Sequence, residues 1–263
     1  MPYRLDVDNP PDTALDTLVA LGAFDVDRTR AGIAAIMPDG VTLDAVAEAL
    51  GACPVAASPA VGRDDDSVWV LAPRMARVGR LVIVPEDVEA PPDAVRLMDT
   101  AAFGTGLHPT TSLCLEALEQ AVDAFGPDRL LDVGIGSGVL ALAALRLGVP
   151  RATGLDTDAG ALRAAARNAR LNRLDTRLRL VAGGPGDVEG QWPLVVANII
   201  AAPLIELAPH LVRRLGRGGR LVLSGIADAV APEVERAYRR LGLTMVARTS
   251  RAGWSALILD TTW

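Results

Sequence analysis

Three glycines at alternate positions follow a short apolar run in the stretch Leu130-Leu-Asp-Val-Gly-Ile-Gly-Ser-Gly138. A strand that leads into such a turn lets the backbone bend tightly and approach a ligand without side chains in the way. Asp156 lies eighteen residues after Gly138. At that distance an acidic residue at the end of the next strand can reach both hydroxyls of a ribose. These residues predict a site for a ligand that contains a nucleoside.

The position of the last glycine separates two classes of ligand. The dinucleotide fingerprint needs a glycine one position later, where this chain has Val139. The pattern Asp-x-Gly-x-Gly-x-Gly is instead typical of proteins that bind S-adenosylmethionine (AdoMet). We therefore expect Gly134, Gly136 and Asp156 to bind AdoMet, and Asp158 to cap the next helix. The alternative is a glycine-rich turn that binds no ligand.

Asn198 is the candidate catalytic residue, because it ends the apolar run Leu194-Val-Val-Ala-Asn198. Ligands of open parallel sheets bind beyond the carboxyl ends of the strands, so Asn198 should share a crevice with Gly134 and Asp156. Its amide would contact AdoMet and orient the lone pair of an attacking nucleophile. Many amino-group methyltransferases follow this residue with Pro-Pro-aromatic, which is absent here. Its absence favours a flexible aliphatic amine over a planar target. A purely structural asparagine is the alternative.

A loop rich in turn residues, Ala102-Phe-Gly-Thr-Gly-Leu-His-Pro-Thr-Thr111, precedes the next helical run. Thr111 should stand at the helix start with its hydroxyl toward the crevice. Phe103 and His108 are candidate contacts of the substrate. A single histidine is more often a hydrogen-bonded structural residue than a base, and that reading of His108 stays open.

Helical and strand-like runs alternate from about residue 110 onward, which predicts a parallel sheet covered on both faces. Two last strand-like runs, joined by Arg251-Ala-Gly253, predict an antiparallel hairpin. The expected fold is the α/β fold of class I AdoMet-dependent methyltransferases, with a Rossmann-like seven-stranded sheet. The expected helices are 111–124, 139–147, 159–172, 203–215 and 232–241, and the expected strands are 129–133, 152–156, 177–182, 194–198, 220–224, 244–249 and 255–260.

The first 62 residues predict a separate small α+β domain. Strands at 3–7, 32–37 and 54–61 and helices at 13–21 and 42–50 give a ferredoxin-like β-α-β-β-α-β order if 24–28 supplies the remaining strand. The polar run Arg63-Asp-Asp-Asp-Ser67 marks the boundary. We expect a substrate-recognition domain over 1–62, a linker with a strand near 80–84 over 63–98, and an AdoMet-dependent domain over 99–263.

Composition narrows the remaining choices. The net charge of −6 argues against a large nonspecific nucleic-acid surface, and no uncharged apolar run is long enough to span a membrane. The start of the chain lacks a signal-peptide pattern, and Cys53 and Cys114 show no metal or disulfide spacing. We expect a cytoplasmic monomer without metal, membrane contact or nucleic-acid substrate. The arginines from Arg163 to Arg179 indicate a solvated helix face, or a surface for an acidic or RNA partner.

Together, Phe103-Gly-Thr-Gly-x-His-Pro-Thr-Thr111 and Asp132-Val-Gly-x-Gly-Ser-Gly138 resemble the ribosomal protein L-eleven methyltransferase family. Further similar motifs are Gly154-Leu-Asp-x-Asp158, Val196-Ala-Asn-Ile-Ile-Ala-Ala-Pro203 and Leu223-Ser-Gly-Ile226. The resemblance covers roughly residues 73–260. It implies that Thr111, Gly134, Asp156 and Asn198 bind AdoMet. It also implies that the chain methylates lysine side chains and the N-terminal α-amine of a ribosomal protein at the stalk base of the large subunit.

Other functions stay open. The chain could be an AdoMet-binding module, or a related N-methyltransferase that acts on another protein or on a small-molecule amine. A nucleic-acid methyltransferase is disfavoured by the acidic charge and by the missing aromatic after Asn198.

Overall fold

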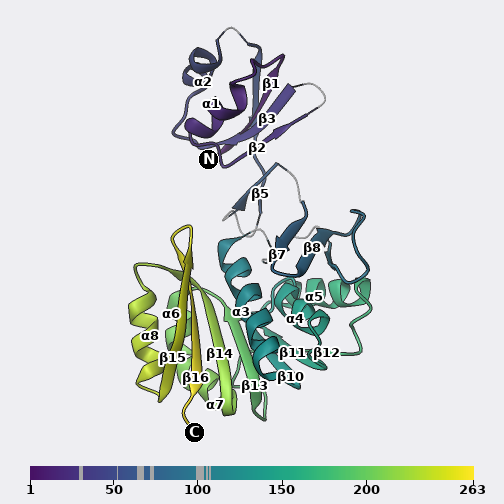
Figure 1. Cartoon of the computed structure of the whole chain (residues 1–263), viewed down its shortest axis with the longest axis vertical. Coiled ribbons are helices and arrows are strands. Elements are labelled where there is room, and N and C mark those ends of the chain that lie inside the picture. Colours follow the sequence, from purple (N-terminus) through teal and green to yellow (C-terminus); the bar gives the residue numbers. More distant parts are fainter. Residues whose placement is uncertain are drawn as a thin grey trace. The chain divides into compact units, whose positions relative to one another are not determined.

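The computed structural model describes residues 1–29, 32–51, 53–63, 68–71, 74–98, 104, 106 and 108–263. The chain divides into two compact units, Met1–Pro73 and Arg74–Trp263, which we describe separately (Figure 1). None of the helices in the described ranges is long and apolar enough to cross a membrane.

The first unit is a four-stranded antiparallel sheet with two helices. Its elements follow the predicted β-α-β-β-α-β order, and its strands lie in the order β2-β3-β1-β4. Helix α2 begins and ends as the sequence predicts, because the Thr42 hydroxyl accepts a hydrogen bond from the Ala45 N–H and Gly51 follows its last turn. The elements are β1 (Tyr3–Asp8), α1 (Ala14–Ala20), β2 (Asp25–Arg28), β3 (Gly32–Met37), α2 (Leu43–Leu50) and β4 (Val55–Pro59), followed by the short pair β5 (Gly62–Arg63) and β6 (Val68–Trp69).

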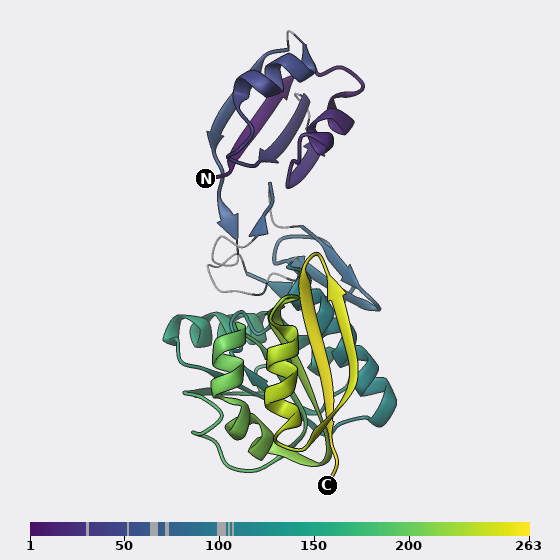
Figure 2. The same cartoon turned by 90° about the vertical axis from the view of Figure 1, so that its left-hand side faces the viewer.

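The second unit contains the seven-stranded sheet that the sequence predicts. Its order is β12-β11-β10-β13-β14-β16-β15, with parallel pairs from β12 to β14 and an antiparallel hairpin at one edge (yellow in Figure 2). The strands are β10 (Arg129–Val133), β11 (Arg151–Asp156), β12 (Leu178–Ala182), β13 (Trp192–Asn198), β14 (Leu215–Ala227), β15 (Leu243–Arg251) and β16 (Trp254–Thr261).

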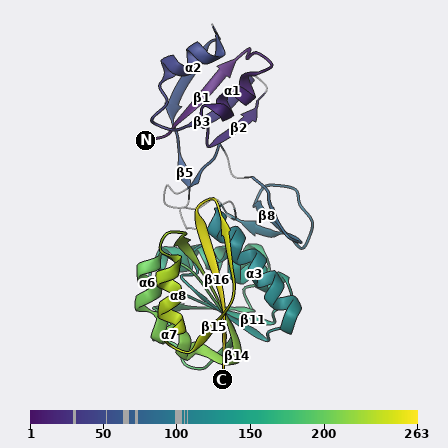
Figure 3. The ribbon, with the colours of Figure 1, turned by 60° about the vertical axis from the view of Figure 1, so that its left-hand side comes forward.

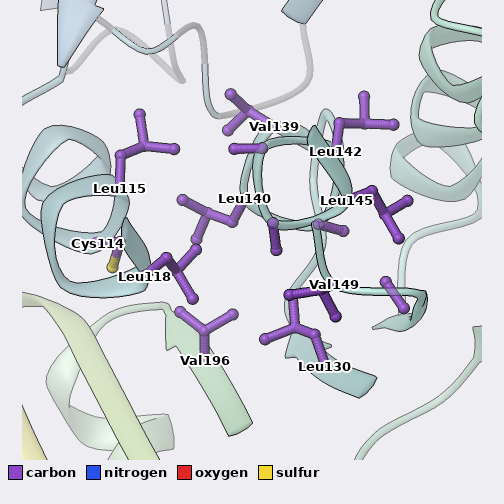
Figure 4. Packing of buried hydrophobic residues seen from close by; sticks show 14 of the residues in the cluster. Cys114, Leu115, Leu118, Leu130, Val139, Leu140, Leu142, Leu145, Val149 and Val196 are labelled. Atoms are coloured by element: carbon purple, nitrogen blue, oxygen red, sulfur yellow. The ribbon is translucent and has the colours of Figure 1, made fainter. Parts of the chain in front are cut away.

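Helices cover the two faces of this sheet. On one face lie α3 (Pro109–Phe125), α4 (Val139–Arg146) and α5 (Ala159–Leu171), and on the other α6 (Ala201–Glu206), α7 (Ala208–Arg214) and α8 (Ala231–Arg239) (Figures 1 and 3). Leu115 and Leu118 of α3, Leu142 of α4 and Leu130 of β10 belong to one cluster of fully buried side chains (Figure 4). Each such side chain contributes roughly 1.5–3 kcal/mol by leaving water. The packing holds the carboxyl ends of the strands in fixed relative positions.

Two predicted elements differ in the structure. The helix expected over 203–215 is two helices, α6 and α7, which meet at Leu207. Pro209 lacks an N–H and suits the first turn of a helix, so it starts α7 instead of continuing α6. The strand expected over 220–224 extends from Leu215 to Ala227, because it pairs with β13 on one side and β16 on the other.

Residues 74–98, the later part of the expected linker, lie within the second unit. Strands β7 (Ala76–Val78), β8 (Leu81–Pro85) and β9 (Val95–Leu97) form a small sheet within the second unit. The side-chain amide of Asn172 in the turn after α5 binds the backbone of β9 twice: Oδ1 accepts from the Arg96 N–H at 2.9 Å and Nδ2 donates to the Arg96 carbonyl at 2.7 Å. These bonds attach residues 74–98 to the rest of the second unit.

Candidate cofactor and acceptor site

The glycine turn after β10 requires glycine for steric reasons. Gly134 has φ 75°, and a Cβ there would lie 2.4 Å from Cγ2 of Ile199. Gly136 and Gly138 also have positive φ, at 54° and 85°. The Gly134 N–H donates to the Leu155 carbonyl at 2.9 Å, which joins the turn to the end of β11. The turn is therefore both tight and fixed, as an approach of backbone to a ligand requires.

Asp156 ends β11 beside this turn. Its Oδ2 accepts from the Gly136 N–H at 3.0 Å and its Oδ1 from the Asp158 N–H at 2.9 Å. The carboxylate is half-buried, and each oxygen keeps lone-pair capacity for a further donor such as a hydroxyl. Asp158 caps α5 as predicted, because its carboxylate accepts from the N–H groups of Gly160 and Ala161.

Asn198 and Thr111 meet at the end of β13. The Asn198 Nδ2 donates to the Thr111 Oγ1 at 3.5 Å, and the two side chains come from positions 87 residues apart. Asn198 is 8% exposed and Thr111 is fully buried. The Asn198 Oδ1 is buried and accepts no hydrogen bond from the described residues. A buried acceptor without a partner is costly, so it indicates a place where a ligand supplies the donor.

His108 caps α3 at the start of the helix that carries Thr111. Its Nδ1 accepts from the Thr110 N–H at 3.3 Å and lies 2.8 Å from the Thr110 Oγ1. The ring also meets Trp254 of β16 edge-on, with centroids 5.2 Å apart. Burial lowers the pKa of His108, which favours a neutral ring. The other candidate substrate contact, Phe103, lies outside the described residues.

Asn168 holds the site together in a way that the sequence analysis missed. From α5, its Nδ2 donates to the Ser137 carbonyl in the glycine turn at 2.8 Å, and its Oδ1 accepts from the Met98 N–H at 2.9 Å. The Ser137 hydroxyl in turn donates to the Gly104 carbonyl at 2.6 Å. The turn is thus bonded to both ends of the segment that contains Phe103. The available signal was a polar residue on the alanine face of α5, where Asn168 is fully buried.

Asp132, the acidic residue of the glycine motif, lies beneath the site. Its Oδ2 accepts from the Ala141 N–H at 3.1 Å, whereas its buried Oδ1 has no partner among the described residues. Burial raises the pKa of Asp132 to about 8, opposed by the Ala141 hydrogen bond and assisted by the charge of Asp156. The carboxyl group is therefore mostly protonated at neutral pH.

The described residues contain no group of three or more His, Cys, Asp or Glu side chains that could hold a metal ion. The site instead offers a glycine-lined turn, a carboxylate at the end of the neighbouring strand and a buried amide oxygen. This set of groups fits AdoMet, whose ribose and sulfonium-bearing chain need hydrogen-bond acceptors and close backbone contact.

Comparison with known proteins gives a consistent result. The family model described as "Ribosomal protein L11 methyltransferase (PrmA)" matches residues 55–262. Proteins of that name are 45% identical over 197 residues in Chromohalobacter salexigens, covering 73% of this chain and 65% of that protein, and 38% identical over 253 residues in Geobacter sulfurreducens, covering 93% and 82%. The chain therefore spans slightly less than two thirds of the first of these relatives.

A solved structure extends the likeness to three dimensions. The crystal structure of ribosomal protein L11 methylase from Lactobacillus delbrueckii subsp. bulgaricus superposes with a TM-score of 0.67 at 31% identity, covering 72% of this chain and all of that chain. The predicted class I methyltransferase fold and the predicted family are both confirmed. On this match over most of its length, the chain belongs to the ribosomal protein L11 methyltransferase family.

Proposed function

We propose that this chain transfers methyl groups from AdoMet to amino groups of ribosomal protein L11, on lysine side chains and on the N-terminal α-amine. The observation that carries this proposal is the buried Asn198 Oδ1, which has no donor among the described residues while Thr111 holds the amide from its other side. An amine N–H is a donor that this oxygen could accept. The family membership supports ribosomal protein L11 as the substrate.

AdoMet supplies a methyl group already activated on a sulfonium, so the protein mainly has to align the reacting atoms and exclude water. Asp156 would accept hydrogen bonds from the ribose hydroxyls, and Gly134 and Gly136 would allow the backbone to approach the ligand. Asn198 and Thr111 would contact it from the end of β13 and the start of α3. The structural elements that carry these residues are held together by the packing of α3 and α4 on β10.

An amine attacks only in its neutral form, and a free lysine has a pKa of about 10.4. The Asn198 Oδ1 would accept one amine N–H and so direct the lone pair toward the methyl group. Burial of the amine among apolar side chains would lower its pKa and favour the neutral form. Phe103 and His108 are the proposed contacts of the incoming chain. The neutral state favoured for His108 would avoid repulsion of an arriving ammonium group.

We propose that residues 1–62 recognise the substrate protein and that residues 63–98 join this domain to the catalytic one. The four-stranded sheet of the first unit has its own core, including Leu5, Leu18, Ile33 and Val46, which suits a separate binding module. The enzyme would act as a monomer in the cytoplasm on the L11 protein of the stalk base.

The test is methyl transfer from labelled AdoMet to purified L11, with intact-mass analysis of the product. We expect mass increments of one or more methyl groups on L11, and a single labelled band when all large-subunit proteins are offered together. Label that appears only in another protein or in a small-molecule fraction would overturn the choice of L11. It would favour the related N-methyltransferase activity instead.

A further inference from the structure

A groove of about 750 Å³ lies at the amino ends of strands β10 to β13, the sheet edge opposite the site built from Gly134, Asp156 and Asn198. Its walls include the first residues of these strands, Arg129, Arg151, Leu178 and Trp192. The groove therefore belongs to a part of the fold that the proposed methyl transfer does not use.

The groove exists because one face of the sheet lacks a helix there. Residues 183–191 connect β12 to β13 without any helix, whereas the connections on either side of β11 each contain one. The main strand contacts of helices α6, α7 and α8 are with β13 to β16, and on this face the amino ends of β11 and β12 are exposed at Arg151 and Arg179. α5 packs against the opposite face (Figure 1).

Arginines occupy the bare face. Arg129 is the neighbour of Arg151 across the β10–β11 pair, and Arg179 is the neighbour of Thr153 across the β11–β12 pair. Cross-strand neighbours point to the same side, and so do residues two apart in a strand, so all four side chains share one face. Including Arg177, the lining contains four arginines and two carboxylates, those of Asp128 and Glu189. The groove has a net charge of +2 in a chain whose net charge is −6.

Two of these guanidinium groups have no described partner to neutralise them. Arg129 and Arg177 bind backbone carbonyls, including those of Gln191 and Val149, and Arg129 also forms an ion pair with Asp128 at 3.7 Å. Arg151 and Arg179 are exposed, and neither side chain forms a hydrogen bond or ion pair with any described residue. They are available to a ligand from outside the chain.

We infer that this groove binds the phosphodiester backbone of RNA. Three apolar residues of its lining are turned away from solvent, since Ala152, Leu178 and Trp192 are at most 9% exposed, and Pro150 is the exposed apolar one. A protein partner normally needs apolar anchors at the centre of its interface, whereas a nucleic-acid backbone is held by charge and hydrogen bonds alone. The guanidinium groups of the arginines supply positive charge and hydrogen-bond donors, and the hydroxyls of Thr153 and Thr176 supply further donors.

A second set of exposed arginines lies on α5, which covers the other face of the sheet. Arg163, Arg167 and Arg170 are exposed on α5, which packs against β12, and none has a described side-chain partner. This is the arginine series whose role the sequence left open between a solvated face and a partner surface. The choice of RNA over DNA rests on the proposed function, because the proposed substrate is a ribosomal protein and ribosomal proteins bind RNA. The RNA here is an anchor and not a methyl acceptor.

Fluorescence anisotropy of the full chain with a labelled single-stranded RNA of ~20 nucleotides tests the inference. The groove variant combines Arg151→Glu with Arg179→Glu. The matched control combines Arg236→Glu with Arg240→Glu, two exposed arginines of the α8 region with no described side-chain partner and the same change in net charge. We expect the groove variant to weaken RNA binding at least about tenfold, and to flatten the plot of log K against log salt by about 1.4. The control should stay within about twofold.

Three results would overturn the inference. They are no RNA binding by the wild type at about 50 mM salt, equal losses in groove and control variants, and displacement of RNA by polyglutamate at equal charge, which would indicate an acidic protein partner. The variant that combines Arg151→Gln with Arg179→Gln removes the charges without reversing them and so controls for misfolding. Its RNA affinity should lie between those of the wild type and the glutamate variant. Methyl transfer to isolated L11, measured in parallel, should be unchanged in the groove variants. Failure of RNA binding is thus distinguishable from failure of the proposed enzyme activity.

Discussion

The Thr111 hydroxyl accepts a hydrogen bond from the Asn198 amide nitrogen at 3.5 Å, across 87 residues of sequence. This contact orients the amide so that Oδ1, the atom without a described donor, is the one left for a ligand. The first turn of α3 and the end of β13 thus act as one unit in presenting a hydrogen-bond acceptor.

Replacement of Asn198 by alanine should therefore affect catalysis more than cofactor binding. We expect Asn198→Ala to lower kcat by about 10²-fold, because the amine loses its orienting acceptor, while the Kd for AdoMet changes several-fold at most. Steady-state kinetics with L11 and calorimetry with AdoMet measure the two quantities. Thr111→Val should produce a smaller loss of the same kind. An equal loss in kcat and affinity would reduce Asn198 to a cofactor contact.

Asp156 should show the opposite pattern. Asp156→Ala removes a carboxylate that would accept two hydroxyl groups, and hydrogen bonds to a charged group contribute roughly 1.5–3 kcal/mol each. We expect AdoMet affinity to fall by at least about tenfold, with kcat at saturation little changed. Asp158→Ala is the matched control, because it removes only the cap of α5. It should cost about 1 kcal/mol of stability without altering AdoMet affinity.

Gly134→Ala tests the steric argument at the glycine turn. Its Cβ would lie 2.4 Å from Ile199 Cγ2 at a positive φ, so we expect a lower free energy of unfolding and weaker AdoMet binding. Gly126→Ala is the control, since φ is also positive there but no atom lies within 4 Å of the added Cβ. It should cost only about 1–2 kcal/mol in urea unfolding. Adding Ile199→Ala to Gly134→Ala should restore part of the loss, and no recovery would argue against the clash.

The buried carboxyl of Asp132 predicts a pH dependence of stability. Its pKa is about 8 in the folded protein against 3.8 ordinarily, so between these values the folded state holds a proton that the unfolded chain releases. The contribution of this group is fully present below about pH 4 and is lost as pH rises through about 8, with a slope of up to ~1.4 kcal/mol per pH unit. Urea unfolding of the wild type and Asp132→Asn should therefore diverge across this range. Parallel pH profiles would contradict it.

His108→Asn separates the structural from the substrate role of that side chain. Asparagine is a good N-cap, so α3 should keep its start and the protein its stability. If the ring contacts the incoming chain, KM for L11 should rise several-fold while the Kd for AdoMet stays the same. An unchanged KM would leave His108 with a structural role, to which its contacts with Thr110 and Trp254 belong.

The sequence predicted the sheet and its helices well because their signals are local. Apolar runs bounded by glycine or proline placed β10 correctly at both ends, and the turn before Trp254 indicated the hairpin. Helix α7 was missed as a separate element because a proline can either start a helix or interrupt one, and only the packing of α6 and α7 decides between them.

The candidate site divides in the same way. Gly134, Asp156 and Asn198 were predicted to share an edge because parallel strands bring their carboxyl ends together. The hydrogen-bond partners of Asn168 could not be predicted from the sequence, because Met98 lies 70 residues and Ser137 31 residues away along the chain. No pattern within one helix shows which backbone groups will face it. The raised pKa of Asp132 likewise depends on burial by elements distant in the sequence.

The two hydrogen bonds of Asn168 have a consequence for how the enzyme could be altered. The side-chain amide of Asn168 fixes the distance between the glycine turn at Ser137 and the backbone at Met98. A substitution of Asn168 should therefore disturb the backbone at Met98 and the glycine turn at Ser137 together. One buried side chain thus couples two backbone segments that lie 39 residues apart in the sequence.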